Sequence, residues 1–247
     1  MADGPVVPPA APGEKRGLRI VVTGSTGKLG KVLADSLRAD GHAVRGFDKI
    51  SEDEHTIAGD LNNFGLLKRT CEGADAICHC AAIPAYNRMD IEMFGSNVRG
   101  TFNTFLAATQ CKVKKLVFAS SLAILLDAGI GEPPPPEHLP MDERHPGRCQ
   151  DIYGVSKLFG EELGRAYSQQ HGMSVICLRP HSIDWRPMDA LTGPLGEGKV
   201  SCWDVVEAFK LALTTDIQYA VYNITGLDWS RITAAKAGEE LGWKPRW

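Results

Sequence analysis

The chain has 247 residues, of which 43% are hydrophobic and 23% charged, and its formal net charge is −3. This length and balance are typical of one large globular domain, or of one domain with a small appendage. The pI near 6.2 excludes the basic footprint of a nucleic-acid-binding protein, and no apolar run reaches the length that would predict a membrane span.

The seven cysteines lack paired spacing, which predicts free thiols in a reducing compartment, and we expect a cytoplasmic protein. Residues 1–16 are rich in proline and predict a disordered tail without the apolar segment of a secretory signal. Cys78, His79 and Cys80 have the side chains of metal ligands. Because alternate residues of a strand face opposite sides, we predict that they pack in the core and form no metal site.

Strands and helices are predicted in alternation. A β-branched run predicts a strand over 18–23, and apolar residues at helical spacing predict a helix over 28–40. Further strands are expected at 43–47, 55–58, 74–80, 115–119, 174–178 and 220–224, and further helices at 62–71, 91–110, 152–171, 203–214 and ending near 241. Gly129 to Arg148 predicts a long loop, and the last third a small cap. The alternation predicts an α/β fold, with a doubly wound parallel sheet and helices on both faces.

Three glycines, Gly24, Gly27 and Gly30, fall at the turn between the first strand and its helix. Glycines there let the backbone approach a pyrophosphate, and the N-terminus of the helix favours its negative charge. The preceding hydrophobic strand and the following amphipathic helix favour dinucleotide binding over a merely structural turn.

Two aspartates end the next two strands. Asp48 is placed where a carboxylate can accept hydrogen bonds from ribose hydroxyls, and its charge would repel a 2′-phosphate, so NAD is favoured over NADP. The alternative is an ordinary aspartate at a strand end, with Arg45 and Lys49 nearby. Asp60 has two open interpretations, which are a contact with the adenine edge and the cap of a helix that starts at Asn62.

Tyr153 and Lys157 lie four residues apart in a predicted helix and share one face. A nearby ammonium lowers the phenol pKa from its usual value of about 10, which makes Tyr153 an acid or base usable near neutral pH. Ser121 ends a strand where parallel sheets bind ligands and can hold a substrate oxygen, unless it forms a turn with Ser120. Asn97 either orients water or backbone near Lys157 or faces solvent.

These motifs resemble the extended short-chain dehydrogenase/reductases of the NAD-dependent epimerase/dehydratase family in order and approximate spacing. The matching stretches include Thr23-Gly-Ser-Thr-Gly-Lys-Leu-Gly30, Gly59-Asp-Leu61, His79-Cys-Ala-Ala82, Asn97-Val-Arg-Gly-Thr-Phe-Asn103, Ser120-Ser121 and Tyr153-Gly-Val-Ser-Lys157. The resemblance implies an NAD-binding Rossmann domain over 17–180, a small substrate-binding cap over 181–247, and a homodimer through the helices that contain Asn97 and Tyr153. It implies a catalytic set of Ser121, Tyr153 and Lys157. The cofactor site that it implies comprises Gly24, Thr26, Gly27, Lys28, Leu29, Gly30, Asp48, Asp60, Leu61, Ala81, Ala82, Asn97, Tyr153 and Lys157.

Within that family, the stretches Tyr153-Gly-Val-Ser-Lys-Leu-Phe-Gly-Glu-Glu-Leu163 and Leu241-Gly-Trp-Lys-Pro245 look like those of uronate dehydrogenases. Those enzymes oxidise a hexuronic acid at C1 to its lactone, with NAD as acceptor. The substrate site implied by this resemblance comprises Pro84, Ser121, Leu122, Tyr153, Ser182 and Arg186. This chain has Pro84 where the family has a serine, Leu122 where it has an asparagine, and Leu191 where it has a carboxylate-binding arginine. Arg186, in the same loop, is the replacement that we predict for that arginine.

We therefore predict an NAD-dependent oxidoreductase that acts on a hydroxyl of a small polar, sugar-like substrate. One alternative is a nucleotide-sugar epimerase or dehydratase, which uses the same triad but needs a larger substrate domain than the residues after Pro180 provide. A second alternative is a non-catalytic NAD(H)-binding sensor, a class that usually lacks the tyrosine or the lysine.

Overall fold

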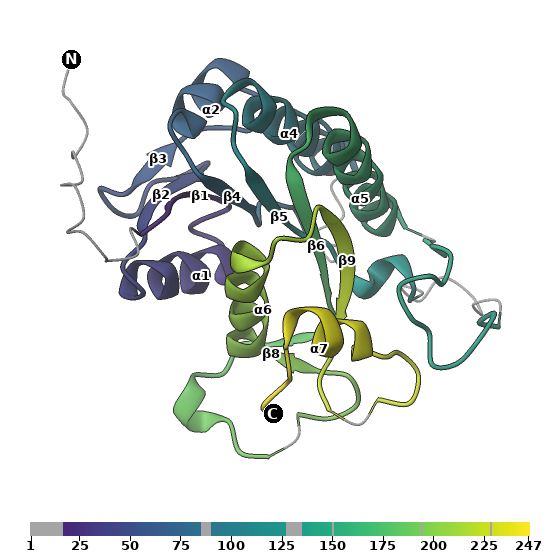
Figure 1. Ribbon diagram of the computed structural model, residues 1–247. Helices are drawn as coiled ribbons and strands as arrows, with labels where there is room; N and C mark the ends of the chain where they lie inside the picture. Colours follow the sequence, from purple (N-terminus) through teal and green to yellow (C-terminus); the bar gives the residue numbers. More distant parts are fainter. Residues whose placement is uncertain (1–16, 85–89, 127–134, 150, 194, 228) are drawn as a thin grey trace.

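Figure 1 shows the computed structural model, which describes residues 17–84, 90–126, 135–149, 151–193, 195–227 and 229–247. The predicted tail over 1–16 and the part of the predicted long loop up to residue 134 lie outside these residues. The centre is a seven-stranded parallel sheet in the order β3-β2-β1-β4-β5-β6-β9. The strands are β1 (Arg19–Thr23), β2 (Ala43–Asp48), β3 (Thr56–Ala58), β4 (Ala76–His79), β5 (Lys115–Ala119), β6 (Ser174–Pro180) and β9 (Tyr219–Ile224).

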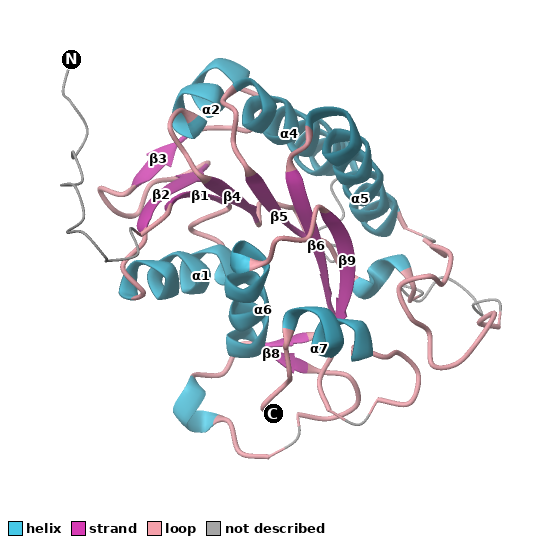
Figure 2. Cartoon of the chain, in the orientation of Figure 1, coloured by secondary structure: helices cyan, strands magenta, loops and turns pink. Residues whose placement is uncertain are grey.

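Helices cover both faces of this sheet, as Figure 2 shows. One face carries α1 (Lys28–Ala39) and α6 (Cys202–Thr214), and the other carries α2 (Phe64–Cys71), α4 (Thr101–Gln110) and α5 (Ile152–His171). Ile20 and Val22 of β1 pack on the α1 side, and Val21 packs on the other. Because successive residues of a strand face opposite sides, a strand that is buried on both faces is continuously apolar. The predicted doubly wound α/β fold is confirmed. Along the described residues, no helix has the length and apolar character needed to cross a membrane.

The strand order reverses at β1, which pairs with β2 on one side and with β4 on the other. The two crossovers therefore leave this point in opposite directions, and a crevice opens beyond the carboxyl ends of the two strands. Ligands of open α/β sheets bind at such switch points. Gly24 directly follows β1, and Cys80 and Ala81 follow β4, so the predicted cofactor residues begin at the edge where the fold places a site.

The predicted helix over 91–110 has an irregular centre. It consists of α3 (Asp90–Met93), a π-helical segment (Phe94–Gly100) and α4. The wider turns of a π segment change which side chains face the sheet, and such segments are frequent at functional sites. Asn97 lies within this segment.

The sheet extends beyond the boundary at residue 180 that we predicted for the cap. Both α6 and β9 come after that boundary, but β9 pairs with β6 and α6 packs beside α1. The region outside the sheet layers is therefore smaller than 181–247, because β9 completes the hydrogen-bond ladder of the central sheet. It contains the short pair β7 (Ile183–Asp184) and β8 (Val200–Ser201), the 3-10 turn Met188–Ala190, and α7 (Ala235–Leu241), which gather below the sheet in Figure 1.

Candidate active site

The turn after β1 can be built only with glycine at two positions. Gly24 has a φ of +72°, and a Cβ there would lie 2.6 Å from the backbone nitrogen of Ala81. A Cβ on Gly30 would lie 2.0 Å from the carbonyl oxygen of Gly24. Either contact is far inside the van der Waals limit, so these glycines bring β1, α1 and the end of β4 into close approach.

This turn forms one wall of a cleft of about 250 Å³. The N-terminus of α1 lies at the same turn, and its cap residue, Gly27, provides no side-chain hydrogen bond to the first backbone N–H groups. Uncapped N–H groups at a helix N-terminus are suited to a phosphate. Residues of the predicted cofactor site that line the cleft are Gly24, Thr26, Gly27, Asp48, Asp60, Leu61, Ala81 and Ala82. Lys28, Leu29 and Gly30 form the first turn of α1 behind it.

Both predicted aspartates line the cleft and hold its backbone. The carboxylate of Asp48 accepts from the backbone nitrogens of Thr26 at 2.9 Å and Lys49 at 2.7 Å. Asp60 accepts from the backbone and side chain of Asn62, both at 2.8 Å, and these bonds lower the pKa of its carboxyl. Of the two interpretations left open for Asp60, the cap of a helix starting at Asn62 is wrong, because the helix starts at Phe64 and Asn63 is its cap.

Asn97 is 2% exposed and does not face solvent. Its amide accepts from the backbone nitrogen of Ile83 at 2.8 Å and donates to the carbonyl oxygen of Ile83 at 2.9 Å. A third contact joins its amide nitrogen to the Ser156 hydroxyl at 3.4 Å. Since Ile83 lines the cleft and Ser156 precedes Lys157, Asn97 connects the cleft wall to α5.

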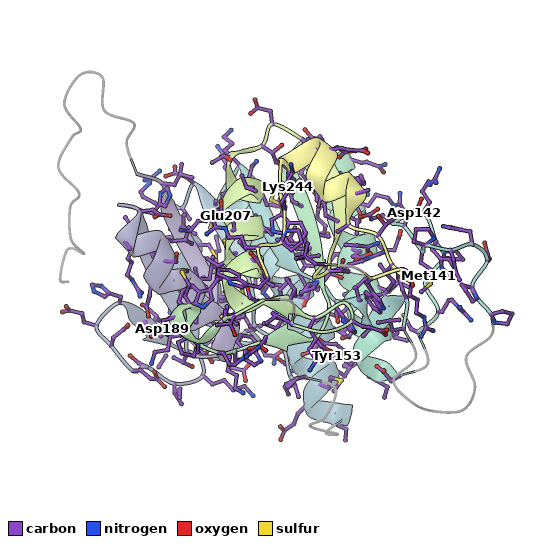
Figure 3. All side chains as sticks on the ribbon, turned by 90° about the horizontal axis from the view of Figure 1, so that it is seen from below. Met141, Asp142, Tyr153, Asp189, Glu207 and Lys244 are labelled. Atoms are coloured by element: carbon purple, nitrogen blue, oxygen red, sulfur yellow. The ribbon has the colours of Figure 1, made fainter. Side chains whose placement is uncertain are left out.

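Tyr153 and Lys157 share a face of α5, as the sequence predicts. The Lys157 nitrogen lies 5.5 Å from the centre of the Tyr153 ring, and Figure 3 labels Tyr153 in a view from below the sheet. Lys157 is 3% exposed and donates to the carbonyl oxygen of Ala119 at 2.7 Å. Burial lowers the pKa of its ammonium to about 8, against the opposing effects of Cys80 and Glu161. The lysine can therefore exchange its proton close to neutral pH.

The residues at the end of β4 surround this ammonium with neutral groups. Burial lowers the pKa of His79 to about 3 and raises that of Cys80 to about 12, so neither carries charge near neutral pH. The His79 ring bonds to the hydroxyls of Thr23 at 2.6 Å and Thr101 at 3.0 Å, which fixes it in the core between β1 and α4. The prediction that this histidine packs in the core is confirmed.

Ser121 follows β5 and begins a 3-10 turn (Leu122–Ile124). Its hydroxyl oxygen accepts from the backbone nitrogen of Ala123 at 3.1 Å, so the hydroxyl keeps its proton as a hydrogen-bond donor. The neighbouring Ser120 turns inward instead. Its hydroxyl donates to the Glu161 carboxylate at 2.5 Å, and the Arg179 guanidinium donates two hydrogen bonds to the same carboxylate.

The predicted substrate residues do not form one group. Leu122 is fully buried in an apolar cluster with Ile124 and Met141, because a leucine side chain gains more from the core than from a polar site. Its assignment to substrate is therefore corrected. Pro84 is half-buried and directly follows Ile83, which lines the cleft.

Ser182 and Arg186 line a different hollow of about 570 Å³, together with Asp184, Trp185 and Lys199. Asp184 already binds the Arg186 guanidinium at 2.9 Å, which neutralises the charge that we predicted for a substrate carboxylate. Lys28 links this hollow to the glycine turn, since its nitrogen lies 5.7 Å from the Trp185 ring.

Sequence reasoning missed Ser96, Ile83, Glu161 and Arg179. Ser96 and Ile83 line the cleft but belong to none of the sequence motifs, so no signal pointed to them. Glu161 and Arg179 did leave a signal, because a carboxylate one helical turn after Lys157 and an arginine inside an apolar strand both need a partner when they are buried. The separation of 18 residues hid the fact that they are each other's partner.

Comparisons with known proteins agree with this geometry. The profile of the NAD dependent epimerase/dehydratase family matches residues 20–183. An L-arabinose 1-dehydrogenase (NAD(P)(+)) from Haloferax volcanii is 33% identical over 68% of this chain and 66% of its own length. A uronate dehydrogenase from Pseudomonas syringae is 30% identical over 65% of this chain and 58% of its own length. A crystal structure of a mutant uronate dehydrogenase from Agrobacterium tumefaciens, complexed with NAD, has a TM-score of 0.78 at 25% identity, and the match covers 93% of this chain and 84% of that one.

The chain therefore belongs to the NAD dependent epimerase/dehydratase family, the extended short-chain dehydrogenase/reductases. Its sequence match spans about two thirds or less of the length of these two curated relatives.

Proposed function

We propose that this member of the NAD dependent epimerase/dehydratase family is a dehydrogenase that oxidises a hydroxyl of a small, sugar-like substrate with NAD. The observation that carries the proposal is the buried Lys157 ammonium beside the Tyr153 ring, at a helix joined by Asn97 to the wall of the glycine-turn cleft. The relatives named as sugar dehydrogenases support the same reaction class.

The residues divide the work as follows. Tyr153 takes the proton of the substrate hydroxyl, because the adjacent ammonium stabilises its phenolate. Ser121 donates its hydroxyl proton to the reacting oxygen and holds it in place. Lys157, fixed by Ala119, keeps the phenol acidic. NAD, when bound, supplies the acceptor for the hydride.

The glycine cradle and the uncapped N-terminus of α1 fit the pyrophosphate of a dinucleotide, since a Cβ would fill the space. Asp48 lies at the end of β2 and lines the cleft, where its carboxylate would hold the ribose hydroxyls of a bound dinucleotide and would repel a 2′-phosphate. Both of its oxygens already hold backbone N–H groups, so its position is fixed before the cofactor arrives. We infer a preference for NAD over NADP from this placement.

We also propose a homodimer through the helices that contain Asn97 and Tyr153. Ile91, at 90% exposed, and Phe94 lie on one helix, and Ile152 and Val155 lie on the other. The two helices pack side by side, so these side chains belong to neighbouring faces. Exposed large apolar residues gathered on packed helices are typical of a protein interface.

A cytosolic location is consistent with the cysteines, all of which are free thiols.

The test of the proposed reaction is a screen of aldoses, hexuronates and small hydroxy acids with NAD, followed by the absorbance of the reduced nicotinamide. We expect at least one aldose or uronate to give net reduction of NAD. Product formation without net reduction would identify the epimerase or dehydratase reaction instead, because those reactions return the hydride to the substrate. A chain that binds no nicotinamide nucleotide would overturn both reactions.

A further inference from the structure

Behind the Tyr153–Lys157 pair lies a buried ion pair to which the proposed reaction gives no task. Glu161 and Arg179 have side chains that are 3% and 5% exposed. The guanidinium donates to both oxygens of the carboxylate, from Nε at 2.8 Å and from Nη2 at 2.7 Å. Among the described residues, Glu161 is the one acceptor of hydrogen bonds from this guanidinium, and the Nη1 atom has no partner there.

The position of the carboxylate follows from the fold. Glu161 is four residues after Lys157, so both side chains lie on the face of α5 that packs on the sheet. Arg179 is near the end of β6, one residue beyond the pairing of Ala119 with Leu178. The carboxylate therefore sits beneath the carboxyl ends of β5 and β6, at the level where Ser120 and Ser121 leave the sheet.

Two contacts connect this carboxylate to the catalytic set. Ser120 donates to Glu161 at 2.5 Å and is the residue directly before Ser121. Ala119, the residue before Ser120, receives the ammonium of Lys157. The end of β5 is thus held from both sides, by the lysine at one residue and by the glutamate at the next.

Stability alone is a weak reason for such a pair. Burying two charges costs desolvation that their attraction often fails to recover, and apolar replacements of buried pairs are often neutral. This pair bonds to Ser120 at the end of β5 and lies one helical turn from the Lys157 ammonium, so its position favours a role in the active site.

We propose that Glu161 is a positioning residue for the Ser–Tyr–Lys set, which supplies the negative charge facing the Lys157 ammonium and anchors the backbone before Ser121 through Ser120. The proposal rests on the proposed function only for its consequence in catalysis, because the charge relation exists in the free protein.

The charge balance around Lys157 depends on few groups. Several titratable groups pack around Lys157 and Glu161. They are His79 from β4, Cys80 directly after it, Tyr153 from α5, Cys177 and Arg179 from β6, Tyr219 from β9, and Glu143 and Cys149 from the loop before α5. Burial lowers the pKa of His79 and raises those of Cys80, Cys177, Cys149 and Tyr219, which keeps these groups neutral near neutral pH. Of these groups, Cys80 and Glu161 are the two whose negative charge would raise the pKa of Lys157. Because Cys80 stays neutral, Glu161 supplies the negative charge that offsets the burial of Lys157.

The test is a pH titration of Lys157 in the whole protein, by NMR of isotopically labelled lysine side chains, with the resonance assigned by its loss in Lys157→Met. In Glu161→Gln the carboxylate charge is gone and Arg179 is left as an uncompensated cation. We expect the midpoint of Lys157 to fall by about one pH unit or more. The matched control is Glu162→Gln, which makes the same change on the next residue, whose side chain is 57% exposed and pairs with Arg165.

The double variant Glu161→Gln with Arg179→Met removes a negative and a positive charge, whose effects on Lys157 oppose each other. We therefore expect its Lys157 midpoint to lie below the wild-type value, by less than half of the fall seen in Glu161→Gln. An unchanged midpoint in Glu161→Gln, or an equal fall in Glu162→Gln, would overturn the proposal. If Glu161→Gln does not accumulate as folded protein, the double variant decides, since it leaves no buried charge unpaired. A midpoint below the wild-type value then supports the proposal, and an equal or higher midpoint overturns it.

This titration needs no substrate, so it separates the two proposals. If the wild-type protein fails to reduce NAD with any sugar while Lys157 responds to Glu161 as expected, the proposed function fails and the charge relation stands. If turnover is found and the Lys157 midpoint is the same in Glu161→Gln as in the wild type, the proposed function stands and the positioning role of Glu161 fails.

Discussion

The ammonium of Lys157 lies 5.5 Å from the centre of the Tyr153 ring, one turn along the same helix, and is almost completely removed from water. A charge at this distance and in this environment acts strongly on its neighbours, because little solvent screens it. The proposed chemistry depends on this relationship, and the fold around it can be tested one feature at a time.

The glycine turn should not tolerate a methyl group at Gly30. Gly30→Ala would place its Cβ 2.0 Å from the Gly24 carbonyl oxygen, so the turn must open and the cradle must distort. We expect the dissociation constant for NAD to rise by roughly tenfold or more, a loss of about 1.4 kcal/mol or more. Calorimetric titration measures it. Gly65→Ala is the matched control, because the nearest atom to a new Cβ on that helix lies at 3.6 Å.

Asp48 should set the cofactor preference. Asp48→Asn removes the charge and keeps an oxygen for the Thr26 backbone nitrogen. We expect the ratio of kcat/KM for NAD to that for NADP to fall by about tenfold, because the variant no longer repels a 2′-phosphate. Asp35→Asn, an equal charge change on the exposed side of α1, should leave the ratio unchanged. If the two variants behave alike, Asp48 does not contact the ribose.

The burial of Lys157 should make the free energy of unfolding depend on pH. The pKa of Lys157 is lowered by burial from 10.5 to about 8, with Cys80 and Glu161 opposing that shift. Between these pH values the unfolded chain binds more protons than the folded one, so the contribution of Lys157 to stability rises with pH. Urea unfolding of the wild type and of Lys157→Met, at steps from about pH 7 to about pH 10, should show the difference in free energy of unfolding growing in favour of the wild type. A constant difference would mean that the lysine is charged and hydrated in the fold.

The proposed dimer predicts that a charge on its apolar face separates the subunits. Val155→Glu places a carboxylate at a position that is 53% exposed in the single chain. Light scattering should give about twice the chain mass for the wild type and about the chain mass for this variant, since a buried unpaired charge is costly. Ile50→Glu is the control, because Ile50 is similarly exposed and lies in the loop after β2, away from both helices. A monomeric wild type would refute the interface.

How far the sequence predicts this molecule depends on the range of the interactions. The helix over 152–171 and the strand over 115–119 agree with the structure to the residue, because local caps and apolar runs set their ends. Asp151 caps the helix through the Gly154 nitrogen, and Gly172 ends it in the left-handed conformation.

Features that depend on distant partners were not predictable in the same way. The π segment around Asn97 has no residue signature, and the role of Asn97 follows from Ile83, which comes before the helix. The pairing of β9 with β6 moved the last strand into the main sheet. Arg186 is predicted to bind substrate from its charge and from its place in the loop of the missing arginine, but Asp184, two residues earlier, already pairs with its guanidinium.

The central claim is that Tyr153 exchanges the proton while NAD is reduced, and its most direct test compares Tyr153→Phe with Tyr167→Phe. Tyr167 lies on the same helix and packs against Phe105, so its change controls for the loss of a hydroxyl. With NAD and a sugar found in the screen, single-turnover formation of reduced nicotinamide should slow by roughly a hundredfold or more in Tyr153→Phe and stay near wild type in Tyr167→Phe, with NAD affinity unchanged in both. Reduction at the wild-type rate in Tyr153→Phe would contradict the account.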